Sequence, residues 1–530
     1  EVSVTSKVSY PFVGTSEEYV VEDKAAVDLY YVDEGTVPYV DVETFINMID
    51  GAMEASMLTY TFQNEDQLLL SYDVEFEDFD GSIINETYTA LIDFGDNTFH
   101  VDTFDFFENY VAATESDYGD GLNYVDAEYV DSDPVTIDLG NYNFDLVMYD
   151  DGGEMQYLMP FAVTNLLFAG GIYYDAYFNG DVIYGIDTFS ISGIDKEADL
   201  WDDVRVSSLN EADMEEDMKW ATYNYTALAF DYFYGLKEDQ GVDTYYDSLV
   251  GRAQSWIEGT DSDIYNGLFD FAYGLDDLHT SHIFPGYYNN PTWPGLSIND
   301  LGSRSKSFYE DGIWAMQDKI EAKYGSVEDR PLFELIDDEK TAVIHLDGFT
   351  IDSPDEVKTV LDGLPATVEN VVFDLSYNTG GNIGAVFRIF GYMTEEQFVY
   401  HSQNPADNAA VTIYIESDYV AYDYNWYIIS SKVSFSAANL MISMAQENGI
   451  ATIMGTKSSG GASSIGTLVT PDGTVLLVST NSVLSTRVGN EVDGWEYLSI
   501  EYGVTPDYIM SDETSDSEII SVIAEDQATE

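Results

Sequence analysis

Residues 427–449 read YIISSKVSFSAANLMISMAQENG and carry the strongest local signal in the chain. An apolar run gives way to a short polar turn, and from Ala437 onward apolar residues recur at helical spacing. The stretch predicts a strand, a tight turn and a helix that begins near Ala437. Ser436 falls in the turn, where its hydroxyl either caps the helix or is exposed as a nucleophile beside the positive helix end.

The surrounding block, residues 341–510, alternates strand and helix patterns. Strands are predicted for TAVIHLDGF, VENVVFDL, VTIYIE, IATIMG and TVLLVS. Helices are predicted for DEVKTVLDGL, for the residues after the paired glycines at 380–381, and from Ala437. Such alternation favours an α/β fold with a mixed or parallel sheet.

A second stretch in this block, VVFDLSYNTGGN at 371–382, runs from a buried strand into Gly380 and Gly381. Glycine lacks a Cβ, so the backbone N–H groups of such a turn can approach a bound oxyanion closely. An ordinary strand-to-helix turn that needs a positive φ would have the same sequence.

A serine nucleophile needs a base, and the chain has five histidines. His279 and His282 lie together in GLDDLHTSHIFPG, at the end of a helical segment. His345 alternates within a predicted strand and is expected to be a packing histidine. His100 and His401 have no constellation of candidate catalytic residues around them.

Composition excludes several classes of function. The 530 residues contain 99 Asp and Glu against 18 Lys and Arg, for a net charge of -81, and such a surface repels nucleic acid. The absence of Cys excludes disulfides, thiolate metal sites and a cysteine nucleophile. No cofactor is expected. No metal site is expected either, because the acidic stretch EFEDFDGS at 75–82 lacks the spacing of a calcium loop. No apolar run reaches ~18 residues, so no membrane span is predicted.

The chain divides by pattern into three predicted regions. Residues 1–195 hold 41 acids and two bases and alternate polar and apolar residues, which predicts a β-rich region. Residues 196–340 form a helical segment and linker that carries the histidine motif, and residues 341–530 form the α/β core. The overall class is α+β multidomain.

Two stretches of the N-terminal region, 27–49 and 144–168, share the order strand, acidic turn, short strand and helix, with Asn47 and Asn165 at matching places. This layout resembles the copper-amine-oxidase-like N-terminal modules of surface proteins. Two similar units that arose by chance would look the same.

Five motifs in order resemble the C-terminal processing peptidases and tricorn-type serine peptidases. They are LDDLHT (275–280), FDLSYNTGG (373–381), SFSAAN (434–439), GTKSSGG (455–461) and EYGVTPD (501–507). The resemblance implies a core of the ClpP/crotonase-like type, a Ser436 nucleophile, and an oxyanion hole from Ala437 with Gly380 or Gly381. No PDZ domain fits between His282 and residue 341, unlike in the processing peptidases.

The resemblance leaves the base open. In processing peptidases it is a lysine at the place of Gly461, and Lys457 is a displaced alternative. The tricorn-type scheme uses a histidine supported by a Ser and a Glu, which implies His279, or His282 with Ser281, together with Glu501. His279 is preferred.

The sequence thus predicts a serine peptidase that acts on peptides or proteins. An inactive peptide-binding protein on the same fold, or an esterase-like hydrolase, would keep the same motifs. The chain starts at Glu1, which is consistent with a removed signal or anchor segment and predicts an extracellular or cell-surface location, although a cloning boundary would look the same.

Overall fold

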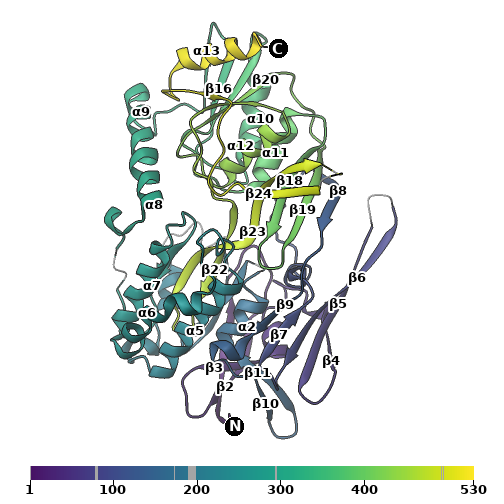
Figure 1. Ribbon diagram of the computed structural model, residues 1–530, viewed down its shortest axis with the longest axis vertical. Coiled ribbons are helices and arrows are strands. Elements are labelled where there is room, and N and C mark those ends of the chain that lie inside the picture. Colours follow the sequence, from purple (N-terminus) through teal and green to yellow (C-terminus); the bar gives the residue numbers. More distant parts are fainter. Residues whose placement is uncertain are drawn as a thin grey trace.

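The computed structural model describes residues 2–77, 81–171, 173–188, 199–292, 295–490, 492 and 494–529. The N-terminal region forms one end of the molecule and the C-terminal α/β region forms the other (Figure 1). The stretch EFEDFDGS at 75–82, for which no calcium loop is predicted, lies partly outside the described residues.

A six-stranded sheet supports the region around Ser436. Its strands are, in spatial order, β15 (Phe333–Ile336), β16 (Thr341–His345), β17 (Asn370–Asp374), β20 (Asn425–Ser430), β21 (Thr452–Gly455) and β25 (Tyr508–Ile509). The strands from β16 to β25 are parallel, and β15 is antiparallel at one edge. This arrangement confirms the predicted fold class.

Helices bury both faces of this sheet. One face forms a hydrophobic cluster with α10 (Ser353–Gly363), α11 (Ile383–Met393) and α12 (Ala437–Glu447). The other face packs on α13 (Asp516–Gln527). Burial on two sides explains why the centres of β17 (VVF) and β20 (WYII) are apolar without alternation.

Two strands of the predicted α/β alternation belong elsewhere. VTIYIE lies in β19 (Ala409–Ser417) and TVLLVS reaches into β23 (Val475–Asn490), and both are part of a separate antiparallel sheet. The other strands of that sheet are β8 (Leu122–Val130), β14 (Ser281–Phe284), β18 (Phe398–Asn404), β22 (Ser463–Val469) and β24 (Gly494–Ser499). β18 and β19 form a hairpin with partly exposed side chains, whereas β16 and β17 are buried throughout.

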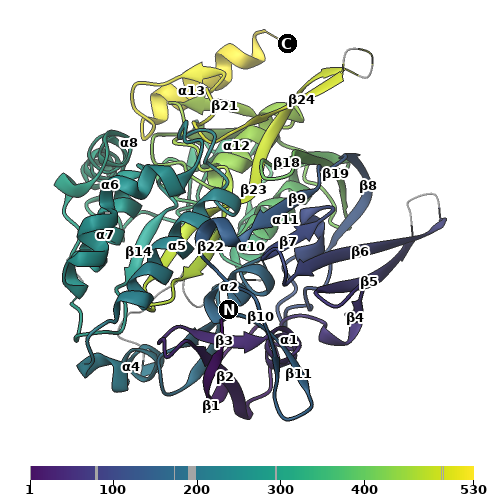
Figure 2. The same ribbon diagram turned by 60° about the horizontal axis from the view of Figure 1, so that its bottom comes forward.

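The N-terminal region is mostly β, as predicted. One sheet has the order β10 (Val147–Asp150), β11 (Met155–Pro160), β3 (Pro38–Asp41), β2 (Lys24–Val32), β1 (Val4–Gly14), β13 (Ile183–Asp187) and β12 (Tyr174–Phe178). The other has the order β4 (Thr59–Phe62), β5 (Gln67–Glu77), β6 (Ile83–Asp93), β7 (Thr98–Val101) and β9 (Val135–Asp138). In Figure 2, β1, β2 and β3 of the first sheet lie at the bottom of the view, and β4, β5 and β6 of the second lie at the right.

The two repeated stretches adopt the predicted layout. The first forms β2, β3 and α1 (Val42–Met48), and the second forms β10, β11 and α2 (Phe161–Phe168). The units join where β3 pairs with β11. The matching asparagines differ, because Asn47 is exposed, whereas the buried Asn165 accepts a hydrogen bond from Ala176 N–H. The resemblance to copper-amine-oxidase-like modules stays a prediction.

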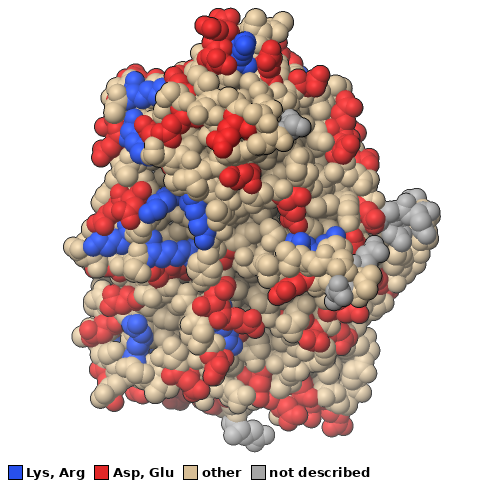
Figure 3. All heavy atoms as spheres, turned by 45° about the horizontal axis from the view of Figure 1, so that its top comes forward, with Lys and Arg blue, Asp and Glu red and all other residues tan. Residues whose placement is uncertain are grey.

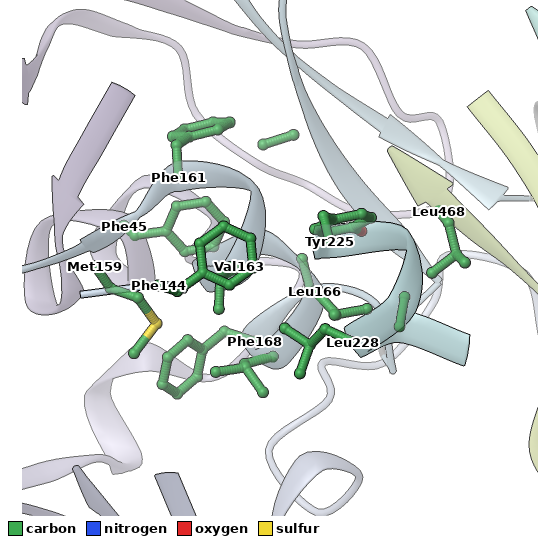
Figure 4. Packing of buried hydrophobic residues seen from close by; sticks show 14 of the residues in the cluster. Phe45, Phe144, Met159, Phe161, Val163, Leu166, Phe168, Tyr225, Leu228 and Leu468 are labelled. Atoms are coloured by element: carbon green, nitrogen blue, oxygen red, sulfur yellow. The ribbon is translucent and has the colours of Figure 1, made fainter. Parts of the chain in front are cut away.

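The predicted helical segment contains α4 (Asp199–Arg205), α5 (Glu216–Tyr232), α6 (Tyr245–Glu258) and α7 (Asp261–Gly274). Its core is continuous with that of the N-terminal region (Figure 4). Phe161 and Leu166 of α2, Tyr225 and Leu228 of α5, and Leu468 of β22 belong to one buried cluster. The regions before and after the predicted boundary near residue 195 therefore share one hydrophobic core.

Residues 303–324, for which the sequence predicts no element, form a helical rod. It consists of α8 (Ser303–Ser307), the π-helical turn η6 (Phe308–Trp314) and α9 (Ala315–Tyr324). Gly312 and the widened turn interrupt the 3.6-residue spacing that would have revealed a helix. In the described part of the chain, no helix has the length and apolar character of a membrane span.

The surface carries many more carboxylates than cations, and the cations are unevenly distributed. Figure 3 shows Asp and Glu scattered over one face, with Lys and Arg gathered in a few groups. Six of the 18 cations lie in the stretch 304–340. Because acids outnumber bases 99 to 18, most carboxylates cannot have a cationic partner, and repulsion among them outweighs the attraction within ion pairs.

We therefore expect added NaCl to stabilise the fold. Salt shortens the screening length from about 10 Å at 0.1 M to about 3 Å at 1 M, which weakens repulsion across the surface. Thermal unfolding followed by circular dichroism should show a Tm that is higher by roughly 5 °C or more at the higher salt. Sucrose at equal osmolality is the uncharged control, and a flat or falling Tm in NaCl would contradict this account.

Candidate active site

Ser436 occupies a strained turn between β20 and α12. Its φ is 57° and its ψ is -121°, which is rare for a residue with a side chain. The side chain forms no capping hydrogen bond with the helix, so the alternative of a simple N-cap does not describe it. Its N–H donates to Gly460 O at 2.8 Å, and its hydroxyl is available for a contact outside the helix.

Hydrogen bonds between two neighbouring loops hold this turn in place. Ser434 Oγ donates to Leu375 O at 2.7 Å, and Ser431 Oγ donates to Ser376 O at 2.6 Å. Phe435 N–H donates to Asn378 O at 3.2 Å. The loops follow β17 and β20, which are adjacent parallel strands, so their carboxyl ends meet at one edge of the sheet, where α/β folds place their sites.

The paired glycines lie directly against the serine. Gly380 has a φ of 105° and Gly381 a φ of 132°. A Cβ on Gly380 would lie 2.7 Å from Ser436 Cβ, and a Cβ on Gly381 would lie 2.1 Å from Phe349 O. Both positions therefore need glycine for conformation and for space.

The two glycines differ in whether their backbone N–H group already donates a hydrogen bond. Gly380 N–H donates to Asn378 Oδ1 at 2.8 Å and is therefore occupied. Among the described residues, nothing accepts a hydrogen bond from Gly381 N–H or from Ala437 N–H, the first amide of α12. Of the predicted oxyanion donors, Gly381 and Ala437 are thus the unpaired ones.

His279 reaches the serine from the other part of the chain. Its Nε2 lies 3.0 Å from Ser436 Oγ, although 157 positions separate the two residues. Its ring packs on Phe435 with the centroids 4.6 Å apart. Asp277 fixes the loop by accepting hydrogen bonds from His279 N–H at 3.0 Å and from Thr280 Oγ1 at 2.6 Å.

The environment keeps the imidazole neutral. Loss of hydration lowers the pKa of His279 to about 4, the positive charge of Arg304 acts in the same direction, and the carboxylate of Asp277 opposes both. Nδ1 of His279 is buried with no hydrogen-bond partner among the described residues. A neutral ring with Nε2 directed at a hydroxyl has the arrangement of a proton acceptor.

One strand sets the relative position of these parts. β14 begins two residues after His279 and pairs with one edge of β23, while β22 begins two residues after Gly461 and pairs with the other edge. Leu476 of β23 is opposite both His282 and Leu468.

The other predicted base residues lie apart from Ser436. His282 is buried within β14 with its ring against Phe269, and Ser281 is the first residue of that strand. Lys457 is exposed, and no contact joins it to Ser436 in the described chain. At Gly461 φ is +84°, and a Cβ would lie 2.3 Å from the Phe435 ring, so the place of the family lysine is sterically filled.

The remaining histidines bind elsewhere. His345 is buried and its Nδ1 lies 2.8 Å from Asp374 Oδ2, as expected for a structural residue. His100 contacts Thr136. His401 lies 2.9 Å from Glu447 Oε1 through Nε2.

Glu501 is buried near the serine but is not bonded directly to His279. Its Oε2 accepts a hydrogen bond from Ala462 N–H at 2.7 Å, and its Oε1 lies 2.7 Å from Arg304 Nη1. Burial raises the pKa of Glu501 to about 7, against the opposing effect of Arg304. The sequence assigned no role to Arg304, which lies outside every motif, or to Asp277, although it is part of LDDLHT at 275–280. No group of three or more His, Asp or Glu residues in the described ranges is placed to hold a metal.

Residues 340–510 match the family model described as peptidase family S41. The matched part of the chain is thus similar to peptidase family S41. The S41 region contains Ser436, the paired glycines and Glu501, whereas His279 lies outside it. This match supports a peptidase, a hydrolase of peptide bonds.

Solved structures similar to the chain include a putative peptidase from Parabacteroides merdae, with 16% identity over 58% of this chain and 93% of that one and a TM-score of 0.42. Mature CPAF has 11% identity over 58% and 96%, with a TM-score of 0.41. The tricorn protease has 11% identity over 98% and 67%, with a TM-score of 0.40. These likenesses are too distant to support an argument about function. No curated protein sequence matches the chain.

The packing around Ser436 predicts the effect of Gly380→Ala. The added methyl would meet Ser436 Cβ, so the serine must move away from His279, and we expect its labelling by a fluorophosphonate to slow by about 100-fold. Gly153→Ala is the matched control, because Gly153 has the same φ of 105° but no atom within 4 Å of its Cβ position. Equal labelling of the two variants would contradict the steric account.

Proposed function

We propose that this protein is a serine peptidase in which Ser436 is the nucleophile and His279 is the general base. The observation that supports the proposal most directly is the 3.0 Å separation of His279 Nε2 and Ser436 Oγ. The strained turn and the neutral ring support the same assignment. The peptidase family of residues 340–510 supports peptides or proteins as the substrates.

In the proposed reaction, Ser436 Oγ attacks the carbonyl carbon of the peptide bond while its proton passes to His279 Nε2. The carbonyl oxygen becomes an oxyanion, which the N–H groups of Gly381 and Ala437 would receive. His279 then gives the proton to the departing amine. A water molecule, activated by the same histidine, hydrolyses the acyl ester and restores Ser436.

Two features of the turn favour the oxyanion. The donors come from backbone fixed by the loop contacts described above, so little reorganisation is needed when charge develops. α12 also directs the positive end of its dipole toward Ser436.

Glu501 supports the base without touching it in this proposal. Its carboxylate would stabilise the imidazolium through charge, because its own contacts are a hydrogen bond from Ala462 N–H and an ion pair with Arg304. The Ser–Lys alternative with Lys457 is less well supported, because that side chain is exposed and makes no contact with Ser436.

Labelling with a fluorophosphonate tests the nucleophile and the base. We expect the intact protein to be labelled and Ser436→Ala to lose all labelling, whereas Ser443→Ala, two turns further along α12, keeps it. His279→Gln should lower the labelling rate by at least about 1,000-fold, because the hydroxyl loses its proton acceptor. His282→Gln is the matched control and should retain the rate once its folding is verified by circular dichroism.

The outcomes separate the alternative functions. Cleavage of a peptide library, lost in Ser436→Ala, is the result expected for a peptidase. Turnover of small esters alone would indicate an esterase, and peptide binding without labelling or cleavage would indicate an inactive binding protein. Labelling that survives Ser436→Ala would exclude this serine.

The low pKa of His279 predicts an unusual pH dependence. Because its pKa is lowered to about 4, the ring stays neutral and able to accept a proton well below the ordinary histidine value of about 6.5. We expect the labelling rate to decline on the acid side near pH 4, with the fold monitored in parallel. A decline near pH 7 that disappears in Glu501→Gln would instead mean that ionisation of Glu501 controls the reaction.

A further inference from the structure

Residue 304 contacts both sides of the candidate active site, through its backbone on one side and its side chain on the other. It is the second residue of α8, at the start of the helical rod. The two sets of contacts connect the loop of His279 to the loop that positions Ser436.

The backbone contact is made by Asp276, three residues before His279. Asp276 Oδ2 accepts a hydrogen bond from Arg304 N–H at 2.7 Å, and Oδ1 accepts one from Ser305 N–H at 2.8 Å. Asp276 itself has a φ of 52°, and a Cβ on Gly302 would lie 2.2 Å from Asp276 Cγ. The beginning of the helical rod is therefore fitted closely to the His279 loop.

The side chain of Arg304 binds the serine side. Its Nη2 donates to Glu501 O at 2.8 Å and to Ser459 O at 3.1 Å, and its Nη1 lies 2.7 Å from Glu501 Oε1. Ser459 precedes Gly460, whose carbonyl accepts the N–H of Ser436. The guanidinium also lies over the Tyr502 ring, 5.0 Å from its centroid.

We propose that Asp276 and Arg304 are positioning residues that together hold His279 at hydrogen-bond distance from Ser436. The inference rests on the proposed function, because it assigns these residues a role in that reaction. Neither residue touches the reacting atoms. A displacement of about 1 Å between a base and its nucleophile is enough to cost about 100-fold in rate, so a contact of this kind affects the reaction without taking part in it.

Arg304 also affects the protonation of two groups in the site. Its guanidinium lowers the pKa of both His279 and Glu501, and Asp277 is the other charged group that acts on these two residues. Loss of Arg304 would leave Asp277 and Glu501 without this nearby cation, and protonation of His279 would become easier. A purely structural residue would not have this effect.

The test compares three variants of the full chain with a matched control. Arg304→Gln removes the charge and most contacts, Arg304→Lys keeps the charge, and Asp276→Asn keeps the shape but can accept only one of the two N–H groups. The control is Arg487→Gln, because Arg487 also pairs with a carboxylate, Glu128 at 2.6 Å, and lies over an aromatic ring, Trp495 at 4.1 Å. Arg487 belongs to β23 and has no part in the site.

We expect Arg304→Gln to slow fluorophosphonate labelling by about 100-fold and to move its acid limb upward by about one pH unit or more. Arg304→Lys should restore the position of the acid limb and part of the rate. Asp276→Asn should slow labelling by at least about 10-fold. Arg487→Gln should lose comparable thermal stability and keep both the rate and the pH profile.

The inference is overturned if folded Arg304→Gln and Asp276→Asn label at the wild-type rate with an unchanged profile. If Arg304→Gln does not fold, the labelling rate of Asp276→Asn decides alone. These outcomes are distinct from failure of the proposed function, because in that case the unmodified chain would not be labelled at Ser436 at all.

Discussion

The pairing of β23 on both edges is the constraint on which the candidate site depends. His279 and Ser436 belong to parts of the chain with separate hydrophobic clusters, the first in the N-terminal and helical region and the second in the α/β region. β14 continues from the histidine loop and β22 continues from the loop beside the serine, and both are hydrogen-bonded to β23. The strand therefore fixes two distant loops in one register, and Asp276 and Arg304 add a second connection between them.

The site combines strained backbone with a buried ion pair. Ser436, Gly380 and Gly381 all adopt positive φ, and loop hydrogen bonds and tight packing maintain them. Around them, Glu501 is paired with Arg304 in a chain that has few cations to place. The surface charge and the buried Glu501–Arg304 pair thus have different effects. The surface charge acts at long range, whereas the buried pair shifts the pKa values of neighbouring groups.

Local sequence was sufficient for the serine side of the site. The strand, turn and helix at 427–449 and the glycines at 380–381 have short-range causes, namely apolar runs, helical spacing and the conformational freedom of glycine. Local sequence could not assign β19 and β23 to their sheet. Period-two alternation indicates that a strand is half buried, but it does not indicate which strands pair with it. The local signals also failed at 303–324, where the π-helical turn interrupts the helical period.

The sequence by itself determined the kind of protein, an acidic α+β chain with a peptidase-like serine turn, because composition and local periodicity are properties of neighbouring residues. Only the tertiary structure decided that His279 and not His282 faces Ser436, that Gly381 and not Gly380 has a free N–H, and that Phe435 fills the space beside Gly461. It also brought Arg304 to Glu501. Each of these depends on contacts between segments far apart in the chain, which local spacing cannot encode.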